Sequence, residues 1–262
     1  MIDRDPVWTA IHAEVQAAAE DEPILASFLH MTVLRHKRLE DVLAFHLSSK
    51  LATSTMDART LMELIAEALD SDPMVGAAVR ADIKAAYERD PACTSYSTPL
   101  LYYKGFHALA SYRITHWLWG HGRQTLALYL QNRISEAFSV DIHPAASIGH
   151  GILLDHGHGF VVGETAVIED NVSILHNVTL GGTGKESGDR HPKIRTGVLI
   201  GAGAKILGNI EVGRGAKIGA GSVVLESVPP HVTVAGVPAK IVGMADSAEP
   251  ALNMNHRFDC SK

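Results

Sequence analysis

An aspartate and a histidine in the second half of the chain have the types and spacing of a general-base site. Asp155 and His156 are adjacent. Repeats in the sequence predict a solenoid of stacked coils, and Asp141 precedes the two residues by slightly less than one coil. An imidazole can take a proton from a hydroxyl when a carboxylate fixes its tautomer and stabilises the imidazolium. We therefore predict His156 as a general base that Asp141 orients. The alternative is a histidine that local hydrogen bonds satisfy at an irregular corner.

Two further segments carry groups suited to small ligands. Arg190 and His191 offer a planar guanidinium fork and a ring N–H, which suit a carboxylate. The alternative is an ordinary solvated loop. Small residues around Ala202 and Ala220 would leave backbone amide groups open to an extended ligand, although tight corners need small residues in any case. The nearby Lys217 and Lys240 are candidates to meet phosphates.

A six-residue repeat supplies the elements that position these candidates. Aliphatic residues recur every six positions, and small residues fill the corners between them. One inward aliphatic side chain per short strand is typical of a parallel β-helix, in which successive coils stack. The repeat slips by two residues just after Leu154, beside His156. Its members are Ile142, Ile148, Leu154, Val162, Ile168, Ile174 and Leu180, then Ile200, Ile206, Val212, Ile218 and Val224.

The rest of the chain predicts a helical domain, one loop and a tail. Apolar residues at helical spacing indicate an all-helical domain over residues 1–139, with helices over Leu101–Trp119 and Arg123–Ala137. The predicted fold is therefore α+β. We expect the helical domain to cap a left-handed parallel β-helix over residues 140–243 and to mediate oligomerisation. A polar segment at about 181–197 is expected to be a loop extruded from one corner, and residues 244–262 a flexible tail.

Composition narrows the function classes. The chain has 262 residues, is 46% hydrophobic and 20% charged, and carries a formal net charge of −6. This balance argues against binding to nucleic acid or to an anionic membrane, and no apolar run is long enough to span a bilayer. Asp3, Arg4 and Asp5 do not fit a signal segment, so a cytoplasmic protein is expected. Cys93 and Cys260 form no redox or metal motif.

Several longer motifs resemble those of the bacterial serine acetyltransferases. The resemblance covers about residues 90–243 closely and the preceding helices more loosely. The motifs are Asp141–Ala146, Leu154–His156, Gly163–Ile168, Thr179–Lys185 and Gly188–Ile194, with Tyr96–Tyr102 and Lys104–Leu109 in the helical half. The resemblance implies transfer of an acetyl group from acetyl-CoA to the hydroxyl of L-serine, the first step of cysteine synthesis. It also implies inhibition by L-cysteine and neither a tightly bound cofactor nor a metal.

The resemblance also implies roles for single residues. Asp90 and Asp155 would meet the serine ammonium group, and Arg190 and His191 its carboxylate, beside His156 as base. Contacts to acetyl-CoA are expected from Gly182, Thr183, Gly184, Ala202, Ala220, Lys217 and Lys240. Family members are typically hexamers, dimers of trimers joined through the N-terminal helices, with the active site between neighbouring β-helices, so a homo-oligomer (a trimer or a dimer of trimers) is expected. Those that dock into O-acetylserine sulfhydrylase end in Ile, whereas this chain ends in Lys262, so the sequence does not predict that complex.

Other functions stay open at this point. An acetyltransferase that acts on a sugar or antibiotic hydroxyl would use the same base and the same cosubstrate. A γ-type carbonic anhydrase shares the solenoid, and His158 and His176 lie one nominal coil apart, with His156 and His191 also available to hold zinc. A β-helical scaffold that only oligomerises would need no base at all.

Overall fold

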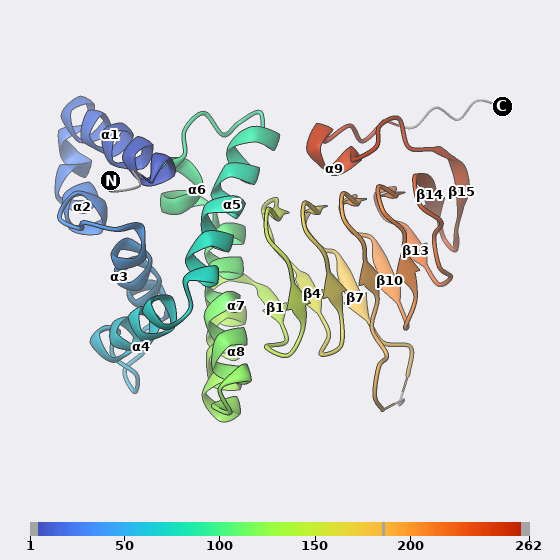
Figure 1. Cartoon of the computed structure of the whole chain (residues 1–262), viewed down its shortest axis with the longest axis horizontal. Helices are drawn as coiled ribbons and strands as arrows, with labels where there is room; N and C mark the ends of the chain where they lie inside the picture. Colours follow the sequence, from blue (N-terminus) through green and yellow to red (C-terminus); the bar gives the residue numbers. More distant parts are fainter. Residues whose placement is uncertain (1–4, 185–186, 258–262) are drawn as a thin grey trace.

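A computed structural model describes residues 5–184 and 187–257 and divides them into two parts (Figure 1). Helices form one end of the molecule, and stacked short strands form the other. The expected α+β fold is confirmed as a helical domain followed by a parallel β-solenoid of about five turns. Within the described residues, no helix is long and apolar enough to cross a membrane.

Carboxylates and prolines begin several of the helices. Asp5, Asp57 and Asp72 accept hydrogen bonds from backbone N–H groups two or three residues ahead, and Pro6 and Pro73 occupy first helical positions. The helical elements are α1 (Pro6–Asp21), η1 (Pro23–Leu25), α2 (Ala26–Leu29), η2 (His30–Leu34), α3 (Leu39–Leu51), α4 (Ala58–Ser71), α5 (Pro73–Arg89), α6 (Ser97–Tyr102), α7 (Lys104–Gly120), α8 (Gln124–Phe138) and, after the solenoid, α9 (Pro250–Asn253).

The helix expected over Leu101–Trp119 is in fact two helices. Tyr103 is extended, with φ −87° and ψ 108°, between the end of α6 and the start of α7. Its hydroxyl donates to Asp90 Oδ2 at 2.8 Å, so the break turns this side chain toward the end of α5. The helix expected over Arg123–Ala137 is confirmed as α8, displaced by one residue at each end.

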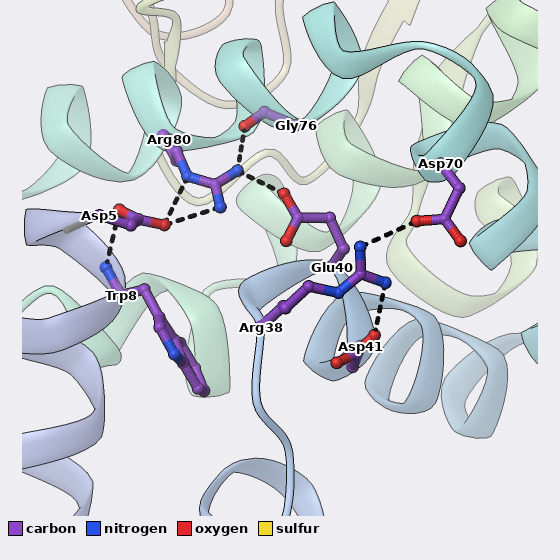
Figure 2. A network of polar contacts seen from close by, with 8 residues as sticks. All are labelled: Asp5, Trp8, Arg38, Glu40, Asp41, Asp70, Gly76 and Arg80. Carbon is purple, nitrogen blue, oxygen red and sulfur yellow. Dashed lines mark hydrogen bonds and ion pairs between the residues drawn. The ribbon is translucent and has the colours of Figure 1, made fainter. Parts of the chain in front are cut away.

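Arginines join the N-terminal helices to one another, as Figure 2 shows. Arg80 of α5 donates to Asp5 and to Glu40, each at 2.7 Å, and thereby links α5 to the start of α1 and to α3. A second cluster surrounds Arg38 and is more exposed. Because water screens exposed pairs, the Arg80 cluster contributes more to holding the helices together.

The solenoid consists of three sheets, and each coil of the chain adds one strand to each of them. Sheet 1 holds β1 (Val140–Ile142), β4 (Phe160–Val162), β7 (Thr179–Gly181), β10 (Lys205–Leu207) and β13 (Val223–Val224). Sheet 2 holds β2 (Ser147–Ile148), β5 (Val167–Ile168), β8 (Lys193–Ile194) and β11 (Glu211–Val212). Sheet 3 holds β3 (Leu153–Leu154), β6 (Ser173–Ile174), β9 (Leu199–Ile200), β12 (Lys217–Ile218), β14 (Val232–Gly236) and the antiparallel β15 (Ala239–Met244).

The aliphatic repeat is confirmed as the core of the solenoid. Ile142 lies beside Val162 and Val162 beside Leu180 on successive coils, and all three side chains are at most 3% exposed. The first of these pairs is separated by 162 − 142 = 20 residues and the second by 180 − 162 = 18 residues. The two extra residues of the first coil enlarge the corner that contains His156.

Two predicted boundaries are corrected. The extruded loop, visible below β7 in Figure 1, leaves after Gly181 and ends before Lys193, because β8 pairs with β5 and β11. The loop therefore does not extend to residue 197. The segment after β15 is packed as far as α9 instead of forming a flexible tail: Ala251 is fully buried, and its carbonyl accepts from Ser173 Oγ at 2.8 Å. Residues 258–262 lie outside the described part of the chain.

The helical part meets the solenoid through a close backbone approach and a buried ion pair. A Cβ atom at Gly105, near the start of α7, would overlap the Leu154 carbonyl, so glycine is needed there. Asp82 of α5 accepts from Arg113 Nε and Nη2 of α7 at 2.9 and 2.7 Å, and from the Ile152 N–H at 2.9 Å. Both charged side chains are buried. Asp82 thus joins two helices to the first coil.

We expect Asp82→Ala to lower the free energy of unfolding by about 3–5 kcal/mol, because it leaves the Arg113 cation buried without a counter-ion, bonded only to backbone carbonyls. Urea unfolding of the full chain measures this. Glu63→Ala is the matched control, since Glu63 pairs with Arg59 on an exposed helix face and such pairs contribute about 1 kcal/mol or less. Equal losses for the two variants would contradict the role given to the buried pair.

Candidate active site

His156 lies at the enlarged corner between β3 and β4, in a backbone conformation that few side chains adopt. Its φ is +57°, and Gly157 and Gly159 follow with φ of +69° and +68°. The Gly157 N–H donates to the Asp155 carbonyl at 2.7 Å, and the Gly159 N–H donates to the Ser139 carbonyl at 2.8 Å. The His156 side chain is 70% exposed. The corner therefore presents the imidazole outward, away from the hydrophobic interior.

A cavity of about 400 Å³ lies between this corner and the helical part, and both contribute to its lining. Asp155 and His156 come from the solenoid, with His156 Nε2 3.7 Å from Asp155 Oδ1. Asp90, at the end of α5, accepts hydrogen bonds from a backbone N–H and from the Tyr103 hydroxyl, each at 2.8 Å. The structure thus brings together three predicted site residues, two from the solenoid corner and one from the end of α5. Two carboxylates beside an imidazole suit an ammonium group next to a hydroxyl.

Tyr103 and Lys104 line the cavity although the sequence did not indicate them. A continuous helix was expected here, and only its break at Tyr103 turns both residues toward the corner. Burial and the neighbouring Asp90 raise the pKa of Tyr103, so its hydroxyl keeps the proton that it donates. Gly105 was the one available signal, because a glycine near a helix start can mark a close approach of two backbones.

Asp141 has a different partner from the one predicted. It lies on β1 beside Val161, and its Oδ1 accepts from Gln131 Nε2 of α8 at 2.7 Å. Across residues 5–184 and 187–257, no hydrogen bond or ion pair joins Asp141 to His156. Within one chain the predicted pair is therefore not made, because Asp141 projects from a strand of sheet 1 whereas His156 lies at the corner after sheet 3.

The enlarged corner also changes which histidines face each other. His156 packs edge-on against His176 of the next coil, with ring centroids 5.6 Å apart and an interplanar angle of 67°. His158, which the nominal period paired with His176, instead has Nδ1 3.2 Å from Lys104 Nζ. In the part of one chain that the structure describes, no three His, Cys, Asp or Glu side chains gather as metal ligands.

Arg190 and His191 lie at another corner, between sheets 1 and 2. Arg190 Nη2 donates to Glu164 Oε2 at 2.7 Å. The buried His191 accepts from the Thr165 N–H at Nδ1, at 3.2 Å, which leaves the ring proton on Nε2. Burial, followed by the nearby Arg190, lowers the pKa of His191, so this ring is neutral near pH 7. The pair offers a charged fork and a neutral N–H, both suited to a carboxylate.

The small residues follow His156 along one edge of the solenoid, here called the His156 edge. The Gly203 N–H donates to the His176 carbonyl at 2.9 Å, and the Gly221 N–H donates to the Ala202 carbonyl at 2.8 Å. His156, His176, Ala202 and the corner that contains Ala220 therefore succeed one another on adjacent coils. The side chains of this row are small below His176, and a Cβ atom at Gly221 would meet nothing within 4 Å, which suits an extended ligand that ends at the imidazole.

The other predicted ligand contacts lie elsewhere. Lys217 is buried, and its ammonium group donates to the carbonyl of Arg257, so the C-terminal segment covers it and it does not face an open surface. Lys240 is exposed on β15. Gly182, Thr183 and Gly184 lie at the base of the extruded loop, on the same corner as Arg190 and His191; this corner is called the loop edge.

A parallel solenoid with an exposed imidazole at one enlarged corner, and with small residues below it, defines a hexapeptide-repeat acyltransferase. Residues 7–111 match the family model "Serine acetyltransferase, N-terminal". Residues 191–226 match the model "Bacterial transferase hexapeptide (six repeats)". The first match lies within the helical part and the second within the solenoid.

Whole-chain comparisons agree with both family models. The serine acetyltransferase of Salmonella typhimurium is 62% identical over 253 residues, which are 97% of this chain and 93% of that protein. A solved serine acetyltransferase in complex with cysteine has a TM-score of 0.95 at 61% identity, over 97% of this chain and 98% of its own. The Brucella abortus enzyme in complex with coenzyme A has a TM-score of 0.90 at 54% identity, over 92% and 96%. The chain belongs to the serine acetyltransferase family.

Proposed function

We propose that this protein transfers the acetyl group of acetyl-CoA to the hydroxyl of L-serine, giving O-acetyl-L-serine and CoA. The observation that carries the proposal is the cavity in which an exposed imidazole lies beside the carboxylates of Asp90 and Asp155. These carboxylates suit the ammonium group of serine, and His156 suits its hydroxyl. A neutral sugar acceptor would leave both carboxylates without a cation.

His156 takes the hydroxyl proton of serine as the oxygen attacks the thioester carbonyl. When the resulting tetrahedral intermediate collapses, the C–S bond breaks and the imidazolium returns the proton to the departing thiolate. Acid–base catalysis of this kind contributes about 10²–10⁴-fold, and holding the two substrates together supplies much of the rest. No proton is gained or lost over the complete reaction.

Binding of serine by both groups of residues requires two chains at each active site. The His156 edge and the loop edge lie on opposite sides of sheet 1. Each coil crosses this sheet with about six residues, and at about 3.3 Å per residue the two edges can be up to roughly 20 Å apart. A serine molecule carries its ammonium and carboxylate groups on one carbon, so it cannot reach both edges of one chain. We infer that the loop edge of one chain faces the His156 edge of a neighbour in a homotrimer. Asp141 then orients the imidazole within this assembly.

The same assembly accommodates the other ligands. The pantetheine arm of acetyl-CoA follows Ala202 and Ala220 along the His156 edge, and Gly182–Gly184 of the neighbouring loop edge close over it. L-Cysteine differs from L-serine by a thiol in place of the hydroxyl, so it competes for the same contacts. A serine acetyltransferase structure with bound cysteine, similar to this chain over 97% of its length, supports this assignment.

We expect Gly163→Ala to raise the KM for serine several-fold without changing the KM for acetyl-CoA. A Cβ atom at this position would overlap the His191 ring, which must then move. Gly120→Ala is the control, because its Cβ would meet nothing within 4 Å. Steady-state kinetics with each substrate varied in turn measures both constants. An unchanged serine KM would remove His191 from the carboxylate site.

Release of CoA thiol from acetyl-CoA in the presence of different acceptors tests the proposed function. We expect L-serine to be preferred over D-serine, 3-hydroxypropionate and a set of sugar and aminoglycoside hydroxyls. A preference for any of the sugar-type acceptors would contradict the assignment of Asp90 and Asp155. Metal analysis of the purified protein, with a CO₂ hydration assay, separates the carbonic anhydrase alternative, which requires stoichiometric zinc.

A further inference from the structure

Arg89, the residue before Asp90, is a buried cation at the end of α5 whose side-chain hydrogen bonds all reach the solenoid. Arg89 is 7% exposed, and its guanidinium donates to Ser173 Oγ and to Asn171 Oδ1, each at 3.2 Å. Within the described residues, no carboxylate lies within 4.0 Å of it, and its Nε has no hydrogen-bond partner. More distant carboxylates attract this cation, but none contacts it. A buried cation without a carboxylate in contact is costly, and an apolar side chain would fill the same space at a lower cost.

The two acceptors of Arg89 belong to the coil next to the catalytic corner. Ser173 lies on β6 and pairs with Leu153 of β3, the strand that leads into Asp155 and His156. The Ser173 hydroxyl donates its own proton to the Ala251 carbonyl at 2.8 Å, so its lone pairs are available to Arg89. Arg89 therefore fixes the end of α5 to the coil that supports the corner.

The carboxylate of Asp90 depends on this attachment. Asp90 is the C-cap of α5: its N–H still donates to the Ala86 carbonyl at 3.0 Å, but its own φ of −94° and ψ of 111° are extended, so the helix ends at this residue. Two donors orient its carboxylate, but neither the backbone N–H nor the Tyr103 hydroxyl belongs to the solenoid. Among the described residues, Arg89 supplies the side-chain link between this helix end and the coil beneath Asp155.

We propose that Arg89 is a positioning residue that holds Asp90 at the correct distance from Asp155 and so sets recognition of the ammonium group of the substrate. This inference rests on the proposed function, because it assumes that the two carboxylates bind that ammonium group. Arg89 itself touches no substrate. Its effect should therefore appear only with ligands that carry the ammonium group.

The test compares two inhibitors of the full-length enzyme that differ only in that group: L-cysteine and 3-mercaptopropionate. For Arg89→Met we expect the inhibition constant of cysteine to rise about tenfold or more, since small misplacements of binding groups have effects of this size. The constant for 3-mercaptopropionate and the KM for acetyl-CoA should stay within about twofold. Loss of thioester absorbance follows the reaction without interference from the added thiols.

Several variants separate positioning from stability. Arg80→Met removes another arginine of α5 that bonds only to helical residues, so it should lower the melting temperature without changing the ratio of the two inhibition constants. Ser173→Ala removes one acceptor of Arg89 and should change the ratio in the same direction as Arg89→Met, but by less. This milder variant provides the test if Arg89→Met does not fold. Arg89→Lys, which can reach one acceptor, should be intermediate.

Asp90→Asn distinguishes failure of the inference from failure of the proposed function. In one outcome, Asp90→Asn weakens the binding of cysteine alone, whereas Arg89→Met and Ser173→Ala weaken the binding of both inhibitors equally or of neither. Arg89 then has only a structural role, and the inference is wrong. If Asp90→Asn does not discriminate between the inhibitors, the ammonium site itself is wrong and both proposals fall. A selective loss of cysteine binding in all three variants supports the positioning role.

Discussion

His156→Asn is expected to lower kcat by about 10²–10⁴-fold while leaving the KM for acetyl-CoA nearly unchanged. The amide cannot take the serine proton or return it to the thiolate. Asparagine is a better choice than alanine here, because His156 has a φ of +57° and asparagine tolerates this conformation. The variant therefore tests chemistry without adding backbone strain. Rapid-quench or steady-state measurements of CoA release would determine both constants.

The stability of this variant serves as its control. The side chain of His156 is largely exposed, so the free energy of unfolding should change by about 0.5 kcal/mol or less. His158→Asn is a matched substitution two residues away, on an exposed side chain that contacts Lys104, and it should retain most of the activity. Near-normal turnover in His156→Asn would remove the general base from the mechanism.

Mixed oligomers are expected to recover activity that neither parent variant has. Arg190→Ala should lower kcat/KM for serine about 10–100-fold, because a hydrogen bond to a charged group contributes about 1.5–3 kcal/mol. His156→Asn oligomers are nearly inactive for a different reason. If each site combines the His156 edge of one chain with the loop edge of another, random trimers of the two variants contain about one intact site in four.

Co-expression with two different affinity tags, followed by tandem purification, yields the mixed trimers. Tandem purification removes the homotrimers, and each remaining mixed trimer has one intact site in three, so the serine activity should reach roughly a third of the wild-type value, far above the average of the two parents. Mixed trimers of wild-type chains and chains that carry both His156→Asn and Arg190→Ala provide the control. Activity no higher than the parental average would mean that both half-sites belong to one chain, which would contradict the two-chain site.

The architecture could be predicted because it depends on short repeats in the sequence. An aliphatic residue every sixth position is enough to specify stacked short strands, and the structure confirms the burial of Ile142, Val162 and Leu180 that this period requires. The slip of two residues after Leu154 likewise indicates an irregular corner from the sequence alone. His156 is predicted as the base in this way, at a break in a regular pattern.

Other features could not be predicted from local patterns. The helix break at Tyr103 depends on its contact with Asp90, thirteen residues earlier, and the docking of α9 depends on Ser173, 78 residues before Ala251. Lys217 looked like a surface cation, but the C-terminal segment covers it. Each of these outcomes is determined by packing between distant parts of the chain, which composition and periodicity do not encode.

The sequence by itself determined the solenoid and the helical domain and predicted His156 as the base, because the six-residue repeat and the helical periods are patterns among residues close together in the chain. The tertiary structure decided which side chains share a site. It placed Asp90 beside Asp155 and His156, paired Asp141 with Gln131, and left Arg190 and His191 on another edge. These relations follow from how helices pack on the first coil and from the direction in which each corner points.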